Sequence, residues 1–271
     1  MPGYRLRPKM PLGALVECLW YWEGAPGPHR QERLLPQAQS AMILNLREDP
    51  IAIYEDNRGG VHYGTAVFSG ARSHCFTIDC NQQERVVGVQ FAPGGAFPFF
   101  RMPMSELEDA SFDMADLWGR EAVRVRERVL AATTPAAMLR VLEECLLELM
   151  RAPERLHPAV IYMAGELDIC EGPGRVQVVT QQIGLSQRRL AQLFHEQVGV
   201  SPKTFHRVRR FQHTLKRLHG LRAVDWAEMA VECGYYDQAH LTHDFRQIAG
   251  MTPSAYLAAA TEHLNHVPLR D

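Results

Sequence analysis

The fold of the second half of the chain is decided by SQRRLAQLFHEQVGVSP, residues 186–202, and by its degenerate copy DQAHLTHDFRQIAGMTP, residues 237–253. Positions 51 residues apart carry the same or an equivalent residue: Gln187 and Gln238, Leu190 and Leu241, Phe194 and Phe245, Gly199 and Gly250, Pro202 and Pro253, Phe205 and Tyr256. Each glycine suits a helix C-terminus, and each Ser/Thr-Pro suits the start of the next helix. Matches at one fixed offset indicate a duplicated supersecondary unit.

Each copy has the layout of a helix-turn-helix. A short helix is expected before a glycine-containing turn, and a second helix follows it, capped by Ser186 in the first unit and by Asp237 in the second. These patterns predict helix-turn-helix units at about 175–197 and 224–247, joined by a long helix from about Pro202 to His219.

The second helix of the first unit has two different faces. One face packs with Leu190, Leu193 and Phe194, and the other holds Arg188, Ala191, Gln192 and His195. The polar face is free to enter a DNA major groove, where arginine reads guanine edges and glutamine reads adenine edges.

The charge is unevenly distributed along the chain. The formal net charge is −2, but residues 175–222 hold ten Lys or Arg and one acid, Glu196, which gives +9. A compact basic stretch indicates a polyanion site or, alternatively, the solvated face of ordinary helices. Residues 223–250 carry −4, with Arg246 as the single base. We therefore expect the first unit to supply most of the DNA affinity.

Residues 186–202 and the segment Gly234 to Tyr256 resemble the two motifs of the AraC/XylS family of bacterial transcription regulators, over about Pro158 to Ala258. The resemblance implies two helix-turn-helix units joined by a long helix, with two recognition helices in successive major grooves. It also implies double-stranded DNA as a partner. A small-molecule effector, RNA polymerase and a homodimer formed through the N-terminal domain are the further partners that it suggests.

The resemblance assigns the DNA contacts residue by residue. The base-reading positions fall on Arg188, Ala191, Gln192, Gln238, Ala239, Thr242 and His243. Phosphate contacts are expected from Lys203, Arg207, Arg209 and Arg210. The effector-binding residues are unknown.

The first half has a different periodicity. Short β-rich runs at 42–46, 51–54, 75–78 and 86–91 are separated by turn signals, which predicts a β-rich barrel or sandwich, compatible with a cupin-like barrel. An amphipathic helix follows Thr134-Pro135, and its Met/Leu stripe at 138–149 is either packed in its own domain or a dimer seam. The overall expectation is an α+β, two-domain protein: an effector-sensing or dimerisation domain at 1–152 and a DNA-binding domain at 153–271.

The N-terminal half also resembles, more weakly, a sensor type found ahead of such DNA-binding domains. The matching features are residues 15–22, 34–37 and 88–95. The run Phe97-Pro98-Phe99-Phe100 is a candidate for lining an effector pocket or covering its entrance.

Other classes are disfavoured by the composition and motifs. The 271 residues are 46% hydrophobic and 22% charged, with no apolar run of membrane length and no signal peptide, so we expect a bacterial cytoplasmic protein. His29, His62 and His74 are far apart, and nucleophile-elbow, phosphate-loop and dinucleotide motifs are missing, so we expect no enzyme activity, metal or cofactor. The alternatives are a ligand-binding or protein-interaction module with weakened DNA binding and, more distantly, a cupin-like enzyme.

Overall fold

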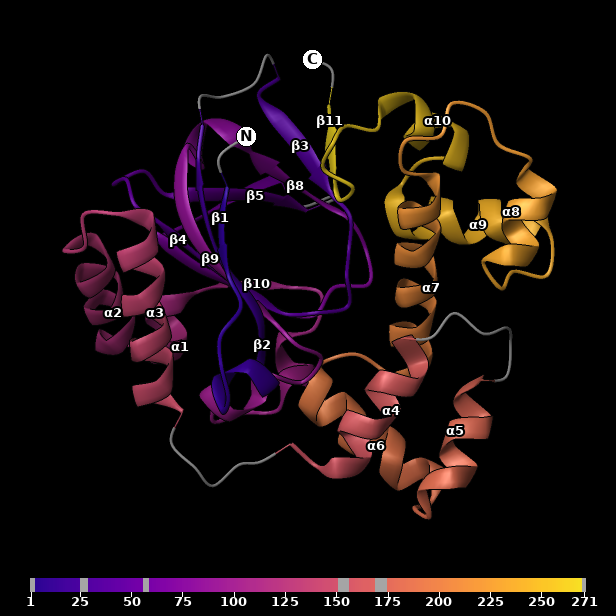
Figure 1. The fold of residues 1–271 in the computed structure, drawn as a ribbon, viewed down its shortest axis with the longest axis horizontal. Helices are drawn as coiled ribbons and strands as arrows, with labels where there is room; N and C mark the ends of the chain where they lie inside the picture. Colours follow the sequence, from indigo (N-terminus) through magenta and orange to yellow (C-terminus); the bar gives the residue numbers. More distant parts are fainter. Residues whose placement is uncertain (1–2, 25–28, 56–58, 151–155, 169–174, 270–271) are drawn as a thin grey trace.

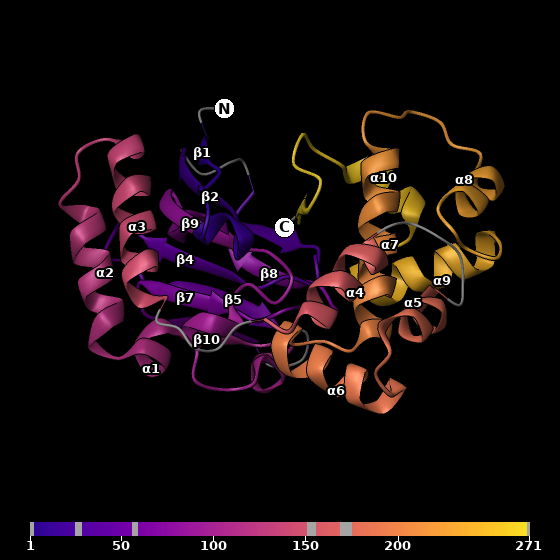
Figure 2. The ribbon, with the colours of Figure 1, turned by 60° about the horizontal axis from the view of Figure 1, so that its bottom comes forward.

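The computed structural model describes residues 3–24, 29–55, 59–150, 156–168 and 175–269. A β-rich N-terminal domain is followed by a helical domain, as the sequence predicts (Figure 1). Figure 2 shows the strands between helices α1–α3 on one side and helices α4–α10 on the other. The expected domain boundary at 152/153 lies outside the described residues. Within the described ranges, no helix has the length and apolar character needed to cross a bilayer.

The described strands form two antiparallel sheets. The first runs in the order β1 (Tyr4–Leu6), β2 (Val16–Glu23), β9 (Arg85–Phe91), β4 (Ala41–Asn45), β7 (Ala66–Ser69) and β10 (Ser111–Asp113). The second runs β11 (His266–Pro268), β3 (Gln31–Leu34), β8 (Phe76–Asp79), β5 (Ile51–Glu55) and β6 (Gly59–Tyr63). The four predicted runs correspond to β4, β5, β8 and β9, within one residue at either end.

Successive side chains along a strand point to opposite faces of the sheet, and the two faces contribute to two different apolar cores. Alternate side chains of β9, including Val87 and Val89, join the large core under the N-terminal helices. Ile53, Val67 and Ile78 belong to a smaller apolar cluster shared by both sheets. The β2–β9 register places Trp20 opposite Gly88, where an added Cβ would lie 2.2 Å from the indole. Glycine is therefore needed for this close approach.

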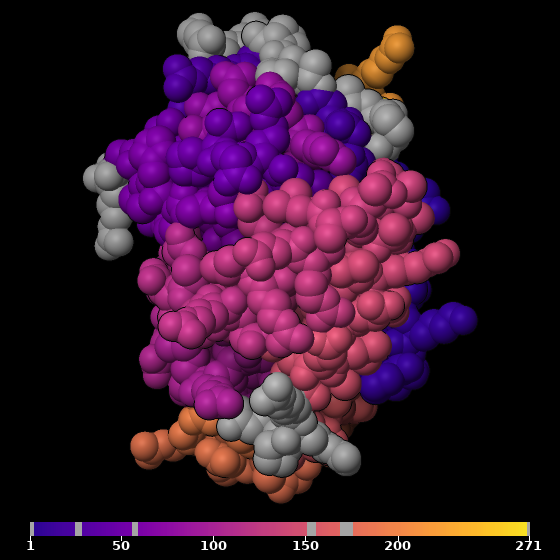
Figure 3. Space-filling view, turned by 90° about the vertical axis from the view of Figure 1, so that its left-hand side faces the viewer, coloured from indigo at the N-terminus to yellow at the C-terminus, as the bar shows by residue number. Residues whose placement is uncertain are grey.

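Three helices cover the outer face of the first sheet: α1 (Met114–Trp118), α2 (Arg120–Leu130) and α3 (Pro135–Leu149). Figure 3 shows their surface from that side. The Thr134 hydroxyl accepts a hydrogen bond from the Ala137 N–H, so it caps α3 as the sequence predicts. Met138, Leu142 and Leu146 are buried against the sheet, which favours the interpretation of the stripe as core packing.

The aromatic run after the Pro-Gly-Gly loop packs in the same core. Phe99 lies 5.6 Å from Phe91 and Phe100 lies 4.4 Å from Phe68, measured between ring centroids. Trp118 donates its indole N–H to the Phe99 carbonyl. The interpretation of this run as an effector-pocket lining is therefore not supported, because Phe99 and Phe100 fill space between sheet and helices.

The helical domain contains α4 (Pro158–Asp168), α5 (Arg175–Ile183), α6 (Gln187–Val198), α7 (Pro202–Leu218), α8 (Trp226–Glu232), α9 (Gln238–Ala249) and α10 (Pro253–Ala259). Helices α6 and α9 have equal lengths and begin 51 residues apart. Ser186 and Asp237 cap them through side-chain hydrogen bonds to the backbone. Gly199 and Gly250 end them at φ +98° and +67°, the left-handed region where glycine is favoured.

The repeat extends to the aromatic packing. The Phe194 and Phe205 rings lie 5.4 Å apart, and their counterparts Phe245 and Tyr256 lie 5.6 Å apart. The duplicated unit inferred from the sequence is thus also duplicated in its core contacts.

The two domains are closely packed in the described structure. After α10 the chain returns as β11 and pairs with β3 of the N-terminal domain, which the sequence did not predict. The Gln212 amide on α7 donates to the Pro36 carbonyl at 2.7 Å. The C-terminal ends of both α6 and α9 touch the N-terminal domain: a Cβ at Gly199 would lie 3.1 Å from the Met104 carbonyl oxygen, and one at Gly250 would lie 3.2 Å from the Arg33 guanidinium.

Candidate nucleic-acid interface

Helices α6 and α9 follow the turns of two helix-turn-helix units at opposite ends of α7 (Figure 1). The 17 residues of α7 correspond to a rod about 25 Å long. Recognition helices that read adjacent major grooves are separated by about one DNA turn, roughly 34 Å. The rod is therefore of the right order to hold two such helices.

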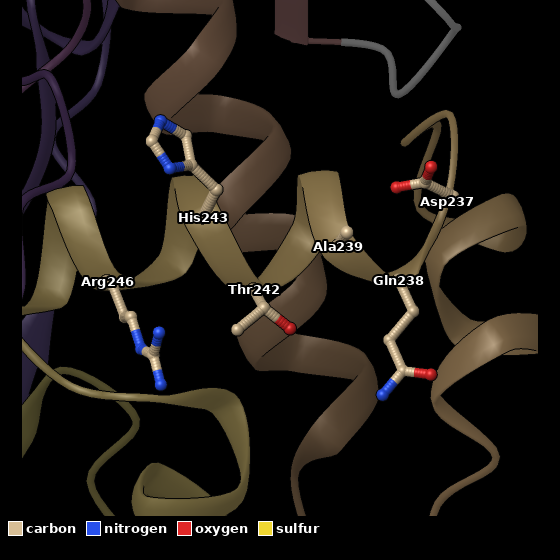
Figure 4. Close-up of a pocket in the computed structure, with 6 residues that line it drawn as sticks. All are labelled: Asp237, Gln238, Ala239, Thr242, His243 and Arg246. Atoms are coloured by element: carbon tan, nitrogen blue, oxygen red, sulfur yellow. The ribbon is translucent and has the colours of Figure 1, made fainter.

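The exposed face of α9 forms a shallow hollow. It is lined by Asp237, Gln238, Ala239, Thr242, His243 and Arg246. Figure 4 shows Gln238, Thr242 and Arg246, one turn apart, pointing to the same side of the helix, while His243 points away from them. The His243 ring is within hydrogen-bond distance of the Gln247 amide, at 2.8 Å. Arg246 is not among the base-reading positions predicted from the sequence, although its spacing from Gln238 and Thr242 puts it on the same side of the helix.

The face of α6 is only partly free. Arg188 and Gln192 are exposed and Ala191 is half-buried. The Gln192 amide donates to Glu196 on the same helix at 2.7 Å. His195, which the sequence placed on the groove-facing side, lies 2.8 Å from the Glu108 carboxylate of the N-terminal domain. His195 is therefore part of a domain contact in this structure.

The four expected phosphate residues lie on α7 but have different surroundings. Lys203 is exposed in the first turn. The Arg207 guanidinium donates to Asp244 at 2.9 Å and also to Gln247. Arg209 pairs with Asp168 on α4, with its side chain only 13% exposed.

Arg210 does not fit the expected phosphate role. Its side chain is 8% exposed, donates to Asp244 at 2.6 Å and lies over the Tyr235 ring at 4.2 Å. Burial raises the pKa of that tyrosine to about 12, so the phenol stays neutral beside the ion pair. The burial of Arg210 and its pair with Asp244 do not favour the predicted phosphate contact, which rested on charge and position along α7.

Several acids of the second unit have partners inside the helical domain. Asp244 pairs with Arg207 and Arg210, and Glu232 pairs with Arg217. The Asp225 and Asp237 carboxylates cap α8 and α9 by accepting backbone N–H bonds. Asp244 and Glu232 thus pair with bases of the joining helix α7, while Asp237 remains on the exposed face of α9.

Comparison with known proteins agrees with this architecture. Residues 179–259 match a family described as "Helix-turn-helix domain", and residues 4–113 match a "Domain of unknown function (DUF6597)". The Arabinose operon regulatory protein of Escherichia coli (strain K12) is 28% identical over 141 residues, which cover 49% of this chain and 47% of that protein. The match therefore spans about half the length of this curated relative.

The helical domain resembles the AraC/XylS family of transcription regulators. This rests on the duplicated helix-turn-helix units together with the two sequence matches that include them.

Three solved structures align with this chain at low sequence identity. ToxT from Vibrio cholerae O395 aligns with a TM-score of 0.48 at 8% identity, over 90% of this chain and 97% of that one. A ToxT structure from Vibrio cholerae strain SCE256 with a bound unsaturated fatty acid aligns with a TM-score of 0.47 at 9% identity, over 92% and 96% of the two chains. The AraC-like transcriptional activator CuxR aligns with a TM-score of 0.20 at 14% identity, over 72% of each chain.

Proposed function

We propose that this protein is a sequence-specific DNA-binding transcription regulator of the AraC/XylS type. The observation that carries the proposal is the pair of exposed polar helix faces at the two ends of one rigid helix, α7. Helices α6 and α9 would enter successive major grooves on one side of the duplex.

The residues that would read bases lie on these two faces, with His243 pointing away from the others on α9 (Figure 4). On α6 they are Arg188, Ala191 and Gln192, and on α9 they are Gln238, Ala239, Thr242, His243 and, in addition, Arg246. Alanines 191 and 239 offer apolar contact, for example to a thymine methyl group. Lys203 and Arg207 would hold phosphates, since Lys203 is exposed and the Arg207 side chain is 30% exposed.

The N-terminal domain would act as the regulatory domain. It touches the C-terminal ends of both recognition helices, through Met104 and Glu108 at α6 and through Arg33 at α9. An effector that prefers one placement of this domain would thereby shift DNA affinity, because a ligand moves an equilibrium only by its differential affinity for the two states. A homodimer through this domain, a contact with RNA polymerase and a cytoplasmic location belong to the same proposal.

The proposal is tested by incubating the full-length protein with sheared genomic DNA of its source at about 150 mM salt, where non-specific binding is weak. Sequencing the retained fragments is expected to give a shared motif with two blocks in adjacent major grooves. Retention of DNA without a shared motif, in the presence and absence of cell metabolites, would contradict it and favour an interaction module.

A further inference from the structure

At one edge of the N-terminal domain, side chains that can bind a metal come together from three separate segments. Strands β3 and β8 pair with Glu32 opposite Ile78. The Cys80 N–H donates to the Arg30 carbonyl at 2.9 Å, which continues that pairing past the end of β8. Because side chains alternate along a strand, Cys80 lies on the same face as Ile78 and Glu32. Cys80 is a free thiol.

The third segment is β11, which returns from the helical domain. It pairs with β3 so that His266 lies opposite Leu34, on the face that also carries Glu32. The His266 Nδ1 atom is 2.7 Å from one Glu32 carboxylate oxygen, and the His29 Nε2 atom is 2.6 Å from the other. Glu32 thus bridges two histidines that are 237 positions apart in numbering.

The donor atoms are close enough to share one ion. One nitrogen of His29, one carboxylate oxygen of Glu32 and the sulfur of Cys80 all lie within 4.8 Å of one another. Tetrahedral zinc binds such ligands at about 2.0–2.3 Å, so its donors are roughly 3.3–3.8 Å apart. Small side-chain rotations would bring the three donor atoms to the separations that a zinc ion requires. The side chains of His29 and Glu32 are 22% and 19% exposed, so the cluster is sheltered but open to solvent on one side.

We propose that His29, Glu32 and Cys80 bind a single zinc ion at this edge of the N-terminal domain, with His266 holding the second oxygen of the Glu32 carboxylate. Imidazole, carboxylate and thiolate are the ligand types that zinc takes in proteins, and three protein ligands leave one position for water. A hydrogen-bonded partner behind a coordinating group orients that group and strengthens binding. His266 fills this role and links the site to the C-terminal strand.

Zinc binds cysteine as the thiolate, so binding of the ion at this site would release the Cys80 proton to solvent.

The test uses the purified full-length chain, stripped of metal and titrated with Zn²⁺ alone, with bound metal measured after dialysis. One equivalent per chain is expected. Titration with Co²⁺ should give a thiolate-to-cobalt charge-transfer band, because that band requires a cysteine ligand. Cys80→Ser should abolish the band and weaken Zn²⁺ binding at least about tenfold, and His266→Gln should weaken binding about 10–100-fold.

Matched controls separate the site from general metal uptake. Cys18→Ser alters another half-buried thiol, and His62→Gln alters an exposed histidine on β6. Both should bind Zn²⁺ as the unaltered protein does. His29→Gln removes a different zinc ligand, so the test remains decisive even if the Cys80→Ser variant does not fold. The proposal is overturned if the unaltered chain takes up no stoichiometric zinc at micromolar concentration, or if His29→Gln binds as tightly as His62→Gln.

Discussion

At the scale of single residues, neighbouring arginines on α7 do different work. Arg207 is partly exposed, whereas Arg210 is enclosed by Asp244 and the Tyr235 ring. The pair Arg210–Asp244 connects α7 to α9 and therefore contributes to the position of the second recognition helix. A buried ion pair is weak evidence for net stability, but removal of one member leaves the other charge uncompensated.

Arg210→Ala is expected to lower the free energy of unfolding by about 1–3 kcal/mol, because Asp244 keeps Arg207 as a partner. The physical reason is that the Asp244 Oδ2 oxygen loses its hydrogen bond from Arg210, while Arg207 still donates to the Oδ1 oxygen. Urea denaturation followed by circular dichroism measures the change. Arg189→Ala, on the exposed side of α6, is the control and should shift stability by less than about 0.5 kcal/mol. A loss below 1 kcal/mol for Arg210→Ala would mean that the pair is not buried in solution.

Lys203→Ala should weaken binding to all DNA sequences alike, because a lysine at a phosphate carries no base information. The slope of log affinity against log salt concentration should fall by about 1. Fluorescence anisotropy with specific and scrambled duplexes gives both numbers. Lys216→Ala, in the last turn of the same helix, is the matched control and should leave the slope unchanged. Loss of sequence preference in the Lys203 variant would place this side chain against a base.

At the scale of elements, α6 and α9 have equivalent caps and equivalent aromatic core contacts but different neighbours. His195 and Arg246 occupy equivalent positions in the repeat. His195 is in contact with Glu108, immediately after the 3-10 helix Met104–Leu107, whereas Arg246 lines the open hollow on α9. The N-terminal domain therefore places a carboxylate beside the first recognition helix.

Glu108→Gln should raise affinity for any DNA several-fold at low salt, because it removes a negative charge beside the surface that approaches phosphates. The gain should shrink as ionic strength rises and the interaction is screened. The DNA affinities of the variant and the unaltered protein, measured at about 50 and about 300 mM salt, test the gain and its dependence on ionic strength. Glu106→Gln removes the same charge from an exposed position of the neighbouring 3-10 helix and should have a smaller effect. Equal gains from both variants would show that the His195 contact has no special role.

The helices that could be predicted from the sequence are those specified by residues close together in the chain. Caps such as Ser186 and Thr134, the C-terminal glycines and the 3.6-residue period act within a few residues, so α3, α6, α7 and α9 were placed within one or two residues at their ends. Strand β11 was missed because three residues with no alternation pair with a segment more than 200 positions away. The His29–Glu32–Cys80 cluster was missed for the same reason, since its members meet only through strand register.

At the scale of the whole molecule, the N-terminal domain packs along α7, the helix that joins the two helix-turn-helix units (Figure 1). Loop residues near Pro36 bond to α7, β11 joins the second sheet, and both glycine C-caps lie against N-terminal residues. The placement of α6 relative to α9 is thus supported from outside the helical domain. A change in the N-terminal domain would be transmitted to both recognition helices through these contacts.

The central claim is that α6 and α9 read separate blocks of one DNA site. The most direct measurement is selection of bound DNA by the unaltered full-length protein, by Arg188→Ala and by Gln238→Ala, followed by sequencing. The unaltered protein should select two blocks centred about 10 base pairs apart. Each variant should lose preference in one block only, at a cost of about 1–3 kcal/mol for that position. Relaxation of the same base pair by both substitutions, or a motif with a single block, would contradict the account.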